Sequence, residues 1–187
     1  GNDCSENFGV GTMVTLTAAP AANSTFTGWT GGGCTGTAPC TVTMTAAASV
    51  TAGFTLNSYP LTVTLAGNAT GTVTSNPPGI DCGVDCAEVY LATTPVTLTP
   101  VPGPNAVFAG WAGGCTGTGA CTVTIGSAAA NVTATFNLIK ANLTVSRTGT
   151  GVGTVTSTPA GINCGTTCVF GFDYGTLVTL NAGATAT

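Results

Sequence analysis

The chain has 187 residues, of which only 4% are charged, and its formal net charge at pH 7 is −4. An ordinary soluble domain carries about 25% charged residues, and proteins that bind nucleic acid or anionic membranes carry clusters of basic ones. Lys140 and Arg147 are the only basic residues, and no apolar run reaches the roughly 18 residues of a membrane helix. We therefore expect no nucleic-acid partner and no insertion into a membrane.

The sequence repeats itself with a period of 82 residues. Three segments return after this interval: LTV at 61–63 and 143–145, GTVTS at 71–75 and 153–157, and the pattern F-x-G-W at 26–29 and 108–111. Self-similarity at a fixed period predicts a tandem array of one small structural unit. Function is then expected in the array, in its length, stiffness or repeated surface.

The repeat register predicts three units. Residues 1–58 form a repeat without its first strands, residues 61–140 a complete repeat, and residues 143–187 the front of a third. Cys4 lies level with Cys86, so its partner is expected before residue 1, and we interpret Cys4 as unpaired through truncation. The predicted linkers are Asn57 to Pro60 and Lys140 to Asn142, which are too short for neighbouring repeats to swing freely.

Alternation with period 2 predicts the strands of the complete repeat. Leu61, Val63 and Leu65 point to one face, and threonines point to the other. Pro77 and Pro78 end the second strand, because proline cannot donate to a sheet, and the stretch from Pro100 to Pro104 is expected to end the fourth. The seven predicted strands are residues 61–66, 72–75, 88–91, 95–99, 107–111, 122–125 and 131–136.

No segment has apolar residues at helical spacing over three turns. We therefore predict an all-β fold, a tandem array of small disulfide-stapled β-sandwich or barrel-like repeats.

Nine cysteines in a chain without histidine indicate disulfides formed outside a reducing cytosol. Local pairs, Cys82 with Cys86 and Cys115 with Cys121, would each contribute about 2 kcal/mol. Cross-pairing such as Cys82 with Cys115 and a tetrathiolate zinc site stay open as alternatives, although the strands between the two pairs argue against a compact zinc site. The predicted disulfide cysteines are Cys34, Cys40, Cys82, Cys86, Cys115, Cys121, Cys164 and Cys168.

Residues 61–138 present a fixed order of signals: LTV, GTVTS, P-x-G-I-x-C-G-x-x-C, F-x-G-W and C-x-G-x-x-x-C-T-V-T. This order closely resembles the divergent internalin-type B-repeat of long, secreted or surface-attached bacterial proteins. Residues 8–56 match the back two-thirds of the pattern, and residues 143–180 match its front half. The resemblance implies an extracellular, non-catalytic β module used in tandem in adhesins, stalks or surface fibres. It supplies no ligand, because the family shares architecture more than activity.

Three carboxylates, Asp81, Asp85 and Glu88, suggest a calcium site. The equivalent positions in the third repeat are Asn163, Thr167 and Phe170, which cannot supply that charge, so we interpret the acids as solvated loop residues. N-glycosylation motifs occur at Asn23, Asn68, Asn131 and Asn142, and so many matches are expected by chance in a Thr-rich chain.

Aromatic residues are the candidates for contact with a ligand or with a neighbouring repeat. Trp29 and Trp111 could stack on sugars, but their place between a Phe and a Gly-rich loop favours an anchor at the base of that loop. Tyr90 and Tyr174 are weaker candidates for an exposed aromatic strip or an inter-repeat contact.

The sequence offers no suitable catalytic residues, because histidine is absent and no Ser or Cys lies near a plausible general base. We expect no enzyme and no cofactor. The favoured prediction is a structural repeat protein of a bacterial stalk, fibre or filament, outside the cell, whose partners are neighbouring repeats and further copies of itself. The alternative is an adhesin segment that recognises a glycan or a host surface protein through the cystine loops. A third reading makes the repeats a spacer for an enzyme domain elsewhere in a longer chain.

Overall fold

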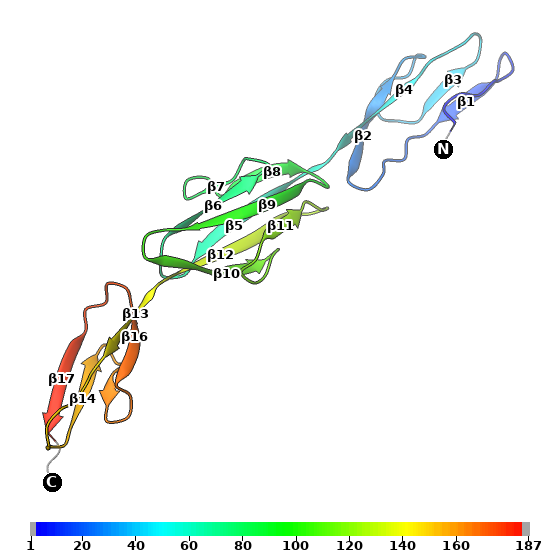
Figure 1. Ribbon diagram of the computed structural model, residues 1–187. Coiled ribbons are helices and arrows are strands. Elements are labelled where there is room, and N and C mark those ends of the chain that lie inside the picture. Colours follow the sequence, from blue (N-terminus) through cyan, green and yellow to red (C-terminus); the bar gives the residue numbers. More distant parts are fainter. Residues whose placement is uncertain (1–2, 185–187) are drawn as a thin grey trace. The chain divides into compact units, whose positions relative to one another are not determined.

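The computed structural model of the protein describes residues 3–184, and these residues form strands and turns without any helix (Figure 1). The predicted all-β fold is thus confirmed. By its contacts the chain forms two compact units, residues 1–61 with 88–96 and 124–130, and residues 62–87 with 97–123 and 131–187. This division differs from the predicted repeat boundaries, which stay a prediction.

Residues 3–56, 58–138 and 140–184 are called the first, second and third repeat below. The first contains β1 (Met13–Leu16), β2 (Ser24–Thr30), β3 (Cys40–Thr43) and β4 (Thr51–Leu56). The second contains β5 (Ser58–Ala66), β6 (Gly71–Asn76), β7 (Asp81–Cys82), β8 (Ala87–Leu91), β9 (Pro95–Pro102), β10 (Ala106–Gly113), β11 (Cys121–Thr124) and β12 (Ala130–Leu138). The third contains β13 (Lys140–Thr144), β14 (Gly153–Thr158), β15 (Asn163–Cys164), β16 (Val169–Asp173) and β17 (Thr179–Ala184).

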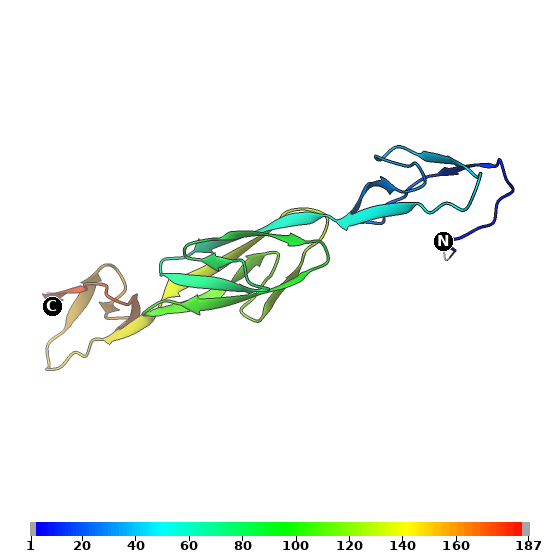
Figure 2. The same ribbon diagram turned by 90° about the horizontal axis from the view of Figure 1, so that it is seen from above.

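The strands pair into several small sheets, which Figure 2 shows from a second direction. The second repeat has two four-stranded sheets with the orders β10-β12-β5-β8 and β11-β9-β6-β7. The first repeat has the pairs β1-β3 and β2-β4, and the third has the pair β13-β16 and the sheet β15-β14-β17. Strands 82 residues apart therefore take the same neighbours where those neighbours are present.

The core follows the period-2 alternation of the sequence. In β5, Leu61 and Val63 are buried, and residues on either side of them are more exposed. The first repeat has a smaller buried cluster around Trp29 and Val42, and the third has one around Ile162 and Phe172. The most deeply buried large side chains are Phe136, Leu61, Leu98, Ile125, Val73, Val96 and Val132, all from the second repeat.

The structure corrects the predicted linkers. Strand β4 ends at Leu56 and β5 begins at Ser58, so that Asn57 alone separates them. Ile139 likewise stands alone between β12 and β13. The predicted linkers, Asn57 to Pro60 and Lys140 to Asn142, therefore lie mostly inside strands. The sequence predicts this strand only from Leu61, because residues 58–60 include a proline and show no clear apolar alternation.

Strand β9 also runs further than predicted, to Pro102 instead of Thr99. Pro100 pairs with Val73 and Pro102 with Gly71 of β6. A strand in an antiparallel sheet donates to a given neighbour only at alternate residues, and β11 on the other side of β9 has only four residues. The missing N–H groups of the two prolines thus do not end the strand.

Two phenylalanines at equivalent positions allow a matched test of the core. Phe136 pairs with Phe108 and is 0% exposed, whereas Phe54 pairs with Phe26 and is 48% exposed. We predict that Phe136→Ala lowers the free energy of unfolding by about 3–5 kcal/mol, because it leaves a cavity in a closed core. Phe54→Ala is expected to cost less than about 1.5 kcal/mol, since half of the ring already faces water. Urea unfolding of both variants measures this, and equal losses would contradict it.

Candidate functional site

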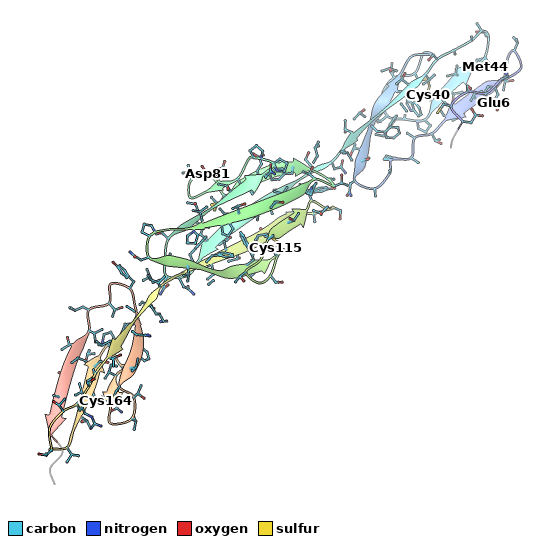
Figure 3. The ribbon with its side chains drawn as sticks, in the orientation of Figure 1. Glu6, Cys40, Met44, Asp81, Cys115 and Cys164 are labelled. Carbon is cyan, nitrogen blue, oxygen red and sulfur yellow. A yellow bond between two sulfur atoms is a disulfide. The ribbon has the colours of Figure 1, made fainter. Side chains whose placement is uncertain are left out.

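The F-x-G-W pattern anchors a cystine loop. In the second repeat, Trp111 is 5% exposed, and its Nε1 donates to the carbonyl oxygen of Gly119 at 3.1 Å. Its backbone N–H donates to the oxygen of Gly117 at 2.7 Å, so the loop is held at two points over the indole. The disulfide between Cys115 and Cys121 closes the same loop (Figure 3).

The Phe, Gly and Trp of the F-x-G-W pattern each have a structural role. The Phe108 ring lies edge-on to Trp111 with the centroids 4.8 Å apart. Strand β10 shifts register between Phe108 and Gly110, a β-bulge that turns the tryptophan toward the loop. Gly110 has φ +142°, and a Cβ there would stand 3.0 Å from the oxygen of Gly117, so only glycine fits without strain.

The first repeat repeats this arrangement. Trp29 is 7% exposed, its Nε1 donates to the oxygen of Ala38 at 2.9 Å, and its backbone N–H donates to the oxygen of Gly36 at 2.9 Å. The loop is closed by the disulfide between Cys34 and Cys40. In both repeats the indole is an anchor for the loop, and most of its surface is unavailable to a ligand.

A second type of cystine loop joins Cys82 to Cys86 and Cys164 to Cys168. The presence of disulfides, predicted from the sequence, is confirmed, and the pairing is local in all four cases. In each loop the carbonyl oxygen of the second cysteine accepts a backbone hydrogen bond. Val63 in β5 donates its N–H to Cys86, and Val145, which directly follows β13, donates its N–H to Cys168, both at 2.8 Å. Cys4 is free and exposed.

The acids of the second repeat surround the first of these loops. Asp81 and Asp85 exchange two backbone hydrogen bonds, and Asn163 and Thr167 exchange the same two in the third repeat. The loop of the third repeat makes these two bonds although it has no carboxylates at the equivalent positions. The loop conformation therefore does not depend on the charge of Asp81 and Asp85. Asp81 is exposed at the edge of the sheet (Figure 3), and residues 3–184 contain no group of three His, Cys, Asp or Glu side chains placed to hold a metal ion.

The two tyrosines named as candidate contacts lie in different surroundings. Tyr90 is 7% exposed and belongs to the core, whereas Tyr174 is 51% exposed. A role for either side chain in binding a ligand stays a prediction. The backbone N–H of Tyr174 donates to the oxygen of Ile139, which makes it part of the linker described next.

The two linker residues, Asn57 and Ile139, make equivalent backbone hydrogen bonds, each through both its N–H and its carbonyl oxygen. Asn57 donates its N–H to the oxygen of Asn23 at 2.8 Å and accepts from the N–H of Ala92 at 2.8 Å. Ile139, 82 residues later, donates to Asn105 at 2.9 Å and accepts from Tyr174 at 2.8 Å. Each linker is thus bonded to the turn that precedes β2 or β10 and to the turn that follows β8 or β16.

The backbone conformation of Asn23 and Asn105 allows each turn to direct a carbonyl oxygen at the linker N–H. Both have a positive φ, 60° and 56°, in the left-handed region that asparagine tolerates better than most residues. The sequence contains an indication of these turns, an asparagine that recurs after 82 residues. Its role is apparent only from the structure, which places each asparagine beside a linker. Sequence reasoning missed the linker bonds, because backbone groups form them and the two linker side chains differ.

A polar cluster adds to the second linker. Lys140 Nζ donates to Asp173 Oδ1 at 2.7 Å, and Asn68 Nδ2 donates to Asp173 Oδ2 at 2.9 Å. Asn68 Oδ1 also accepts from the N–H of Leu138 at 2.9 Å. The hydrogen bond from Lys140 holds the pKa of Asp173 below its ordinary value of 3.8, with smaller lowering contributions from the charge of Lys140 and from Asn68. The side chain of Asn68, part of one glycosylation motif, is therefore engaged on both its atoms.

Comparison with known proteins identifies one family. A family model described as the divergent InlB B-repeat domain matches residues 1–58 and 61–140. No curated protein and no solved structure matches the chain. Among the residues that the structure describes, none forms a helix of the length and apolarity that crossing a bilayer requires.

Removal of one cystine tests its contribution. We predict that the double variant Cys115→Ser, Cys121→Ser loses about 2 kcal/mol of unfolding free energy, because the unfolded chain regains the entropy of an open loop. Urea unfolding followed by tryptophan fluorescence measures the loss. Cys4→Ser is the control, since this thiol is free and exposed. An unchanged midpoint in the double variant would contradict the prediction.

The lowered pKa of Asp173 gives a pH prediction with a definite sign. The bond to Lys140 contributes fully above about pH 4, the pKa of an unfolded aspartate, and is lost as the pH falls through the lower pKa of the folded state. An NMR titration of the carboxyl carbon should give a midpoint below 3.8. Lys140→Met should raise that midpoint, and the same midpoint in both proteins would show that Lys140 is not the cause.

Proposed function

Because the chain belongs to the divergent InlB B-repeat domain family, we propose that it is a stiff, non-catalytic spacer in a stalk or fibre on a bacterial surface. The family and the four disulfides indicate an extracellular repeat module. Repeat domains of this family are generally non-enzymatic.

The hydrogen-bonded linkers carry the proposal. A flexible linker leaves its backbone groups to water, and its ends then move as a random coil. Asn57 and Ile139 each have both backbone groups bonded, one to a turn of the repeat before and one to a turn of the repeat after. Bending at either residue requires breaking at least one such bond, at a net cost of about 0.5–1.5 kcal/mol each. The same bonds at both linkers suit an array that transmits force.

The surface suits long exposure outside a cell. The chain offers trypsin-like proteases two basic residues, Lys140 and Arg147, and Lys140 lies in strand β13 with its ammonium bonded to Asp173. Threonine hydroxyls pair across neighbouring strands, Thr15 with Thr41 at 3.1 Å and Thr97 with Thr122 at 3.2 Å. The outward faces are thus polar without charge.

An adhesin that stacks sugars on tryptophan receives less support from this geometry. Trp29 and Trp111 are buried and bonded to their own loops, and Tyr90 is buried as well. Spacer function requires none of these side chains to meet a ligand.

A linker insertion tests the proposed function. We predict that the second and third repeats tumble with one rotational correlation time in 15N NMR relaxation, because Ile139 is bonded on both sides. Inserting Gly-Ser-Gly-Ser after Ile139 should give each repeat its own, shorter correlation time. The matched control carries the same insertion after Gly126, in an exposed turn between β11 and β12. Independent tumbling in the unmodified chain would contradict the proposal.

A further inference from the structure

The second repeat protects the edges of its two sheets. Strands β10 and β8 are the edges of one sheet, and β11 and β7 are the edges of the other. The larger cystine loop covers β10, since the N–H of Trp111 donates to the oxygen of Gly117, and β7 pairs with its own returning loop. Strand β11 has only four residues. An exposed edge is a template for pairing with another chain, and short strands, covering loops and charged side chains are the usual protection.

Two carboxylates protect the remaining edge, that of β8. The backbone bond of Cys86 faces β5, and bonding alternates along an antiparallel strand, so the odd-numbered residues direct their N–H groups away from the sheet. The N–H of Ala87 donates to Asp85 Oδ1 at 3.2 Å, and that of Val89 donates to Glu88 Oε1 at 2.7 Å. The two acids thus occupy N–H groups that a further strand would need.

The equivalent edge of the third repeat, that of β16, lacks this protection. The carbonyl of Cys168 bonds on the side of β13, so Val169 and Gly171 direct their N–H groups outward. Thr167 and Phe170 stand at the positions of the two acids. In the part of the chain that the structure describes, the N–H groups of Val169 and Gly171 meet no acceptor.

The free side of β16 belongs to the architecture of the repeat. Strand β8 ends the four-stranded sheet of the second repeat and has β5 as its only neighbour, just as β16 has β13. This edge is therefore terminal in a repeat that has both four-stranded sheets. The difference between the two edges lies in the residues at 167 and 170 and not in the number of strands.

The one charge on β16 is compensated. Asp173 accepts from Lys140 at 2.7 Å and from Asn68 at 2.9 Å, and the other four residues of the strand are Val, Phe, Gly and Phe. Like charges directly opposite each other destabilise a strand pair, and two copies of this strand avoid that cost. The formal net charge of −4 over 187 residues adds little repulsion between whole chains.

We propose that β16 of one copy of the chain pairs with β16 of a second copy, antiparallel and about a two-fold axis at Gly171. This register places Val169 opposite Asp173 of the second copy, and Gly171 opposite its own equivalent. Residues 169, 171 and 173 all direct their backbone groups outward, and each such opposed pair exchanges two hydrogen bonds, about six in total. Because both copies use the same surface, the contact closes as a dimer.

The aromatic residues of β16 fit the same register. Phe170 and Phe172 lie edge-on with their centroids 4.9 Å apart, and the two-fold axis places Phe170 opposite Phe172 of the second copy. Aromatic pairs across neighbouring strands stabilise a sheet. Each copy contributes a strand of only five residues, so we expect a weak dimer with a dissociation constant of about 10 µM to 1 mM. The inference goes beyond the proposed function, since this pairing needs no rigid linker.

Sedimentation of the full chain tests the pairing, in a Cys4→Ser background that excludes disulfide-linked dimers. The fraction of dimer should grow with protein concentration. The double variant Thr167→Asp, Phe170→Glu introduces the acids of the second repeat and should raise the dissociation constant by about tenfold or more. The matched control, Thr124→Asp with Val107→Glu, adds the same charge at exposed positions of other strands and should dimerise normally. A monomer at every concentration would overturn the inference and leave the edge to a strand of another protein, and equal dimerisation of the two double variants would overturn it as well.

A proline provides a second variant with its own control. Gly171→Pro removes an outward N–H and leaves the hydrogen bonds to β13 in place, so it should abolish the dimer. Val89→Pro makes the same change at the equivalent position of the protected strand β8 and should leave dimerisation unchanged. Equal effects of the two prolines would contradict a contact at β16.

Hydrogen exchange tests the register. The amides of Val169 and Gly171 should exchange more slowly as the protein concentration rises, because they become bonded in the dimer. The amide of Val89 is the reference and should not change. No slowing at Gly171 would overturn the register. A monomeric chain with rigid linkers would refute this inference alone, whereas independently tumbling repeats in a dimerising chain would refute only the proposed function.

Discussion

The pair of backbone hydrogen bonds at each single-residue linker is the constraint on which the account rests. Asn57 and Ile139 have different side chains, yet each donates to a turn asparagine and accepts from the turn after an edge strand. Strands β4 and β12 therefore pass into β5 and β13 with one residue between them, and that residue is itself bonded. Side-chain hydrogen bonds add to this at both linkers: Thr25 and Tyr59 bond to the side chain of Asn57, and Lys140 and Asn68 bond to Asp173 beside Ile139.

The cystine loops make repeats of this size durable. A unit of about 80 residues buries a smaller share of its surface than a larger domain, and local disulfides compensate for this. The F-x-G-W pattern gives the larger loop a second attachment, because Trp111 binds two carbonyls of the loop and packs against Phe108. The residues that attract attention as a sugar-binding site thus serve the stability of the loop.

The sequence alone predicted much of the fold. Period-2 alternation placed β6 and β11 to within one residue at each end, and the cysteine spacing favoured local pairs, although cross-pairing stayed open. Strand β7 was missed, because two residues show no period. The linker bonds were not predicted, because backbone groups form them and the one side-chain signal, an asparagine at both 23 and 105, is recognised only beside the folded linker. Phe54 and Phe136 share one pattern and differ in the strands beside them, since among the described residues β4 pairs with β2 alone. The repeat register had predicted a first repeat without its first strands, but not which side chain their absence exposes.

Hydrogen exchange at the linker amides tests the central claim most directly. The N–H groups of Asn57 and Ile139 are bonded to Asn23 and Asn105, so they should exchange as slowly as amides within β12. The amide of Gly151, in an exposed turn, gives the fast reference. Slow exchange at both linkers is the predicted result, and exchange as fast as that of Gly151 would contradict the account.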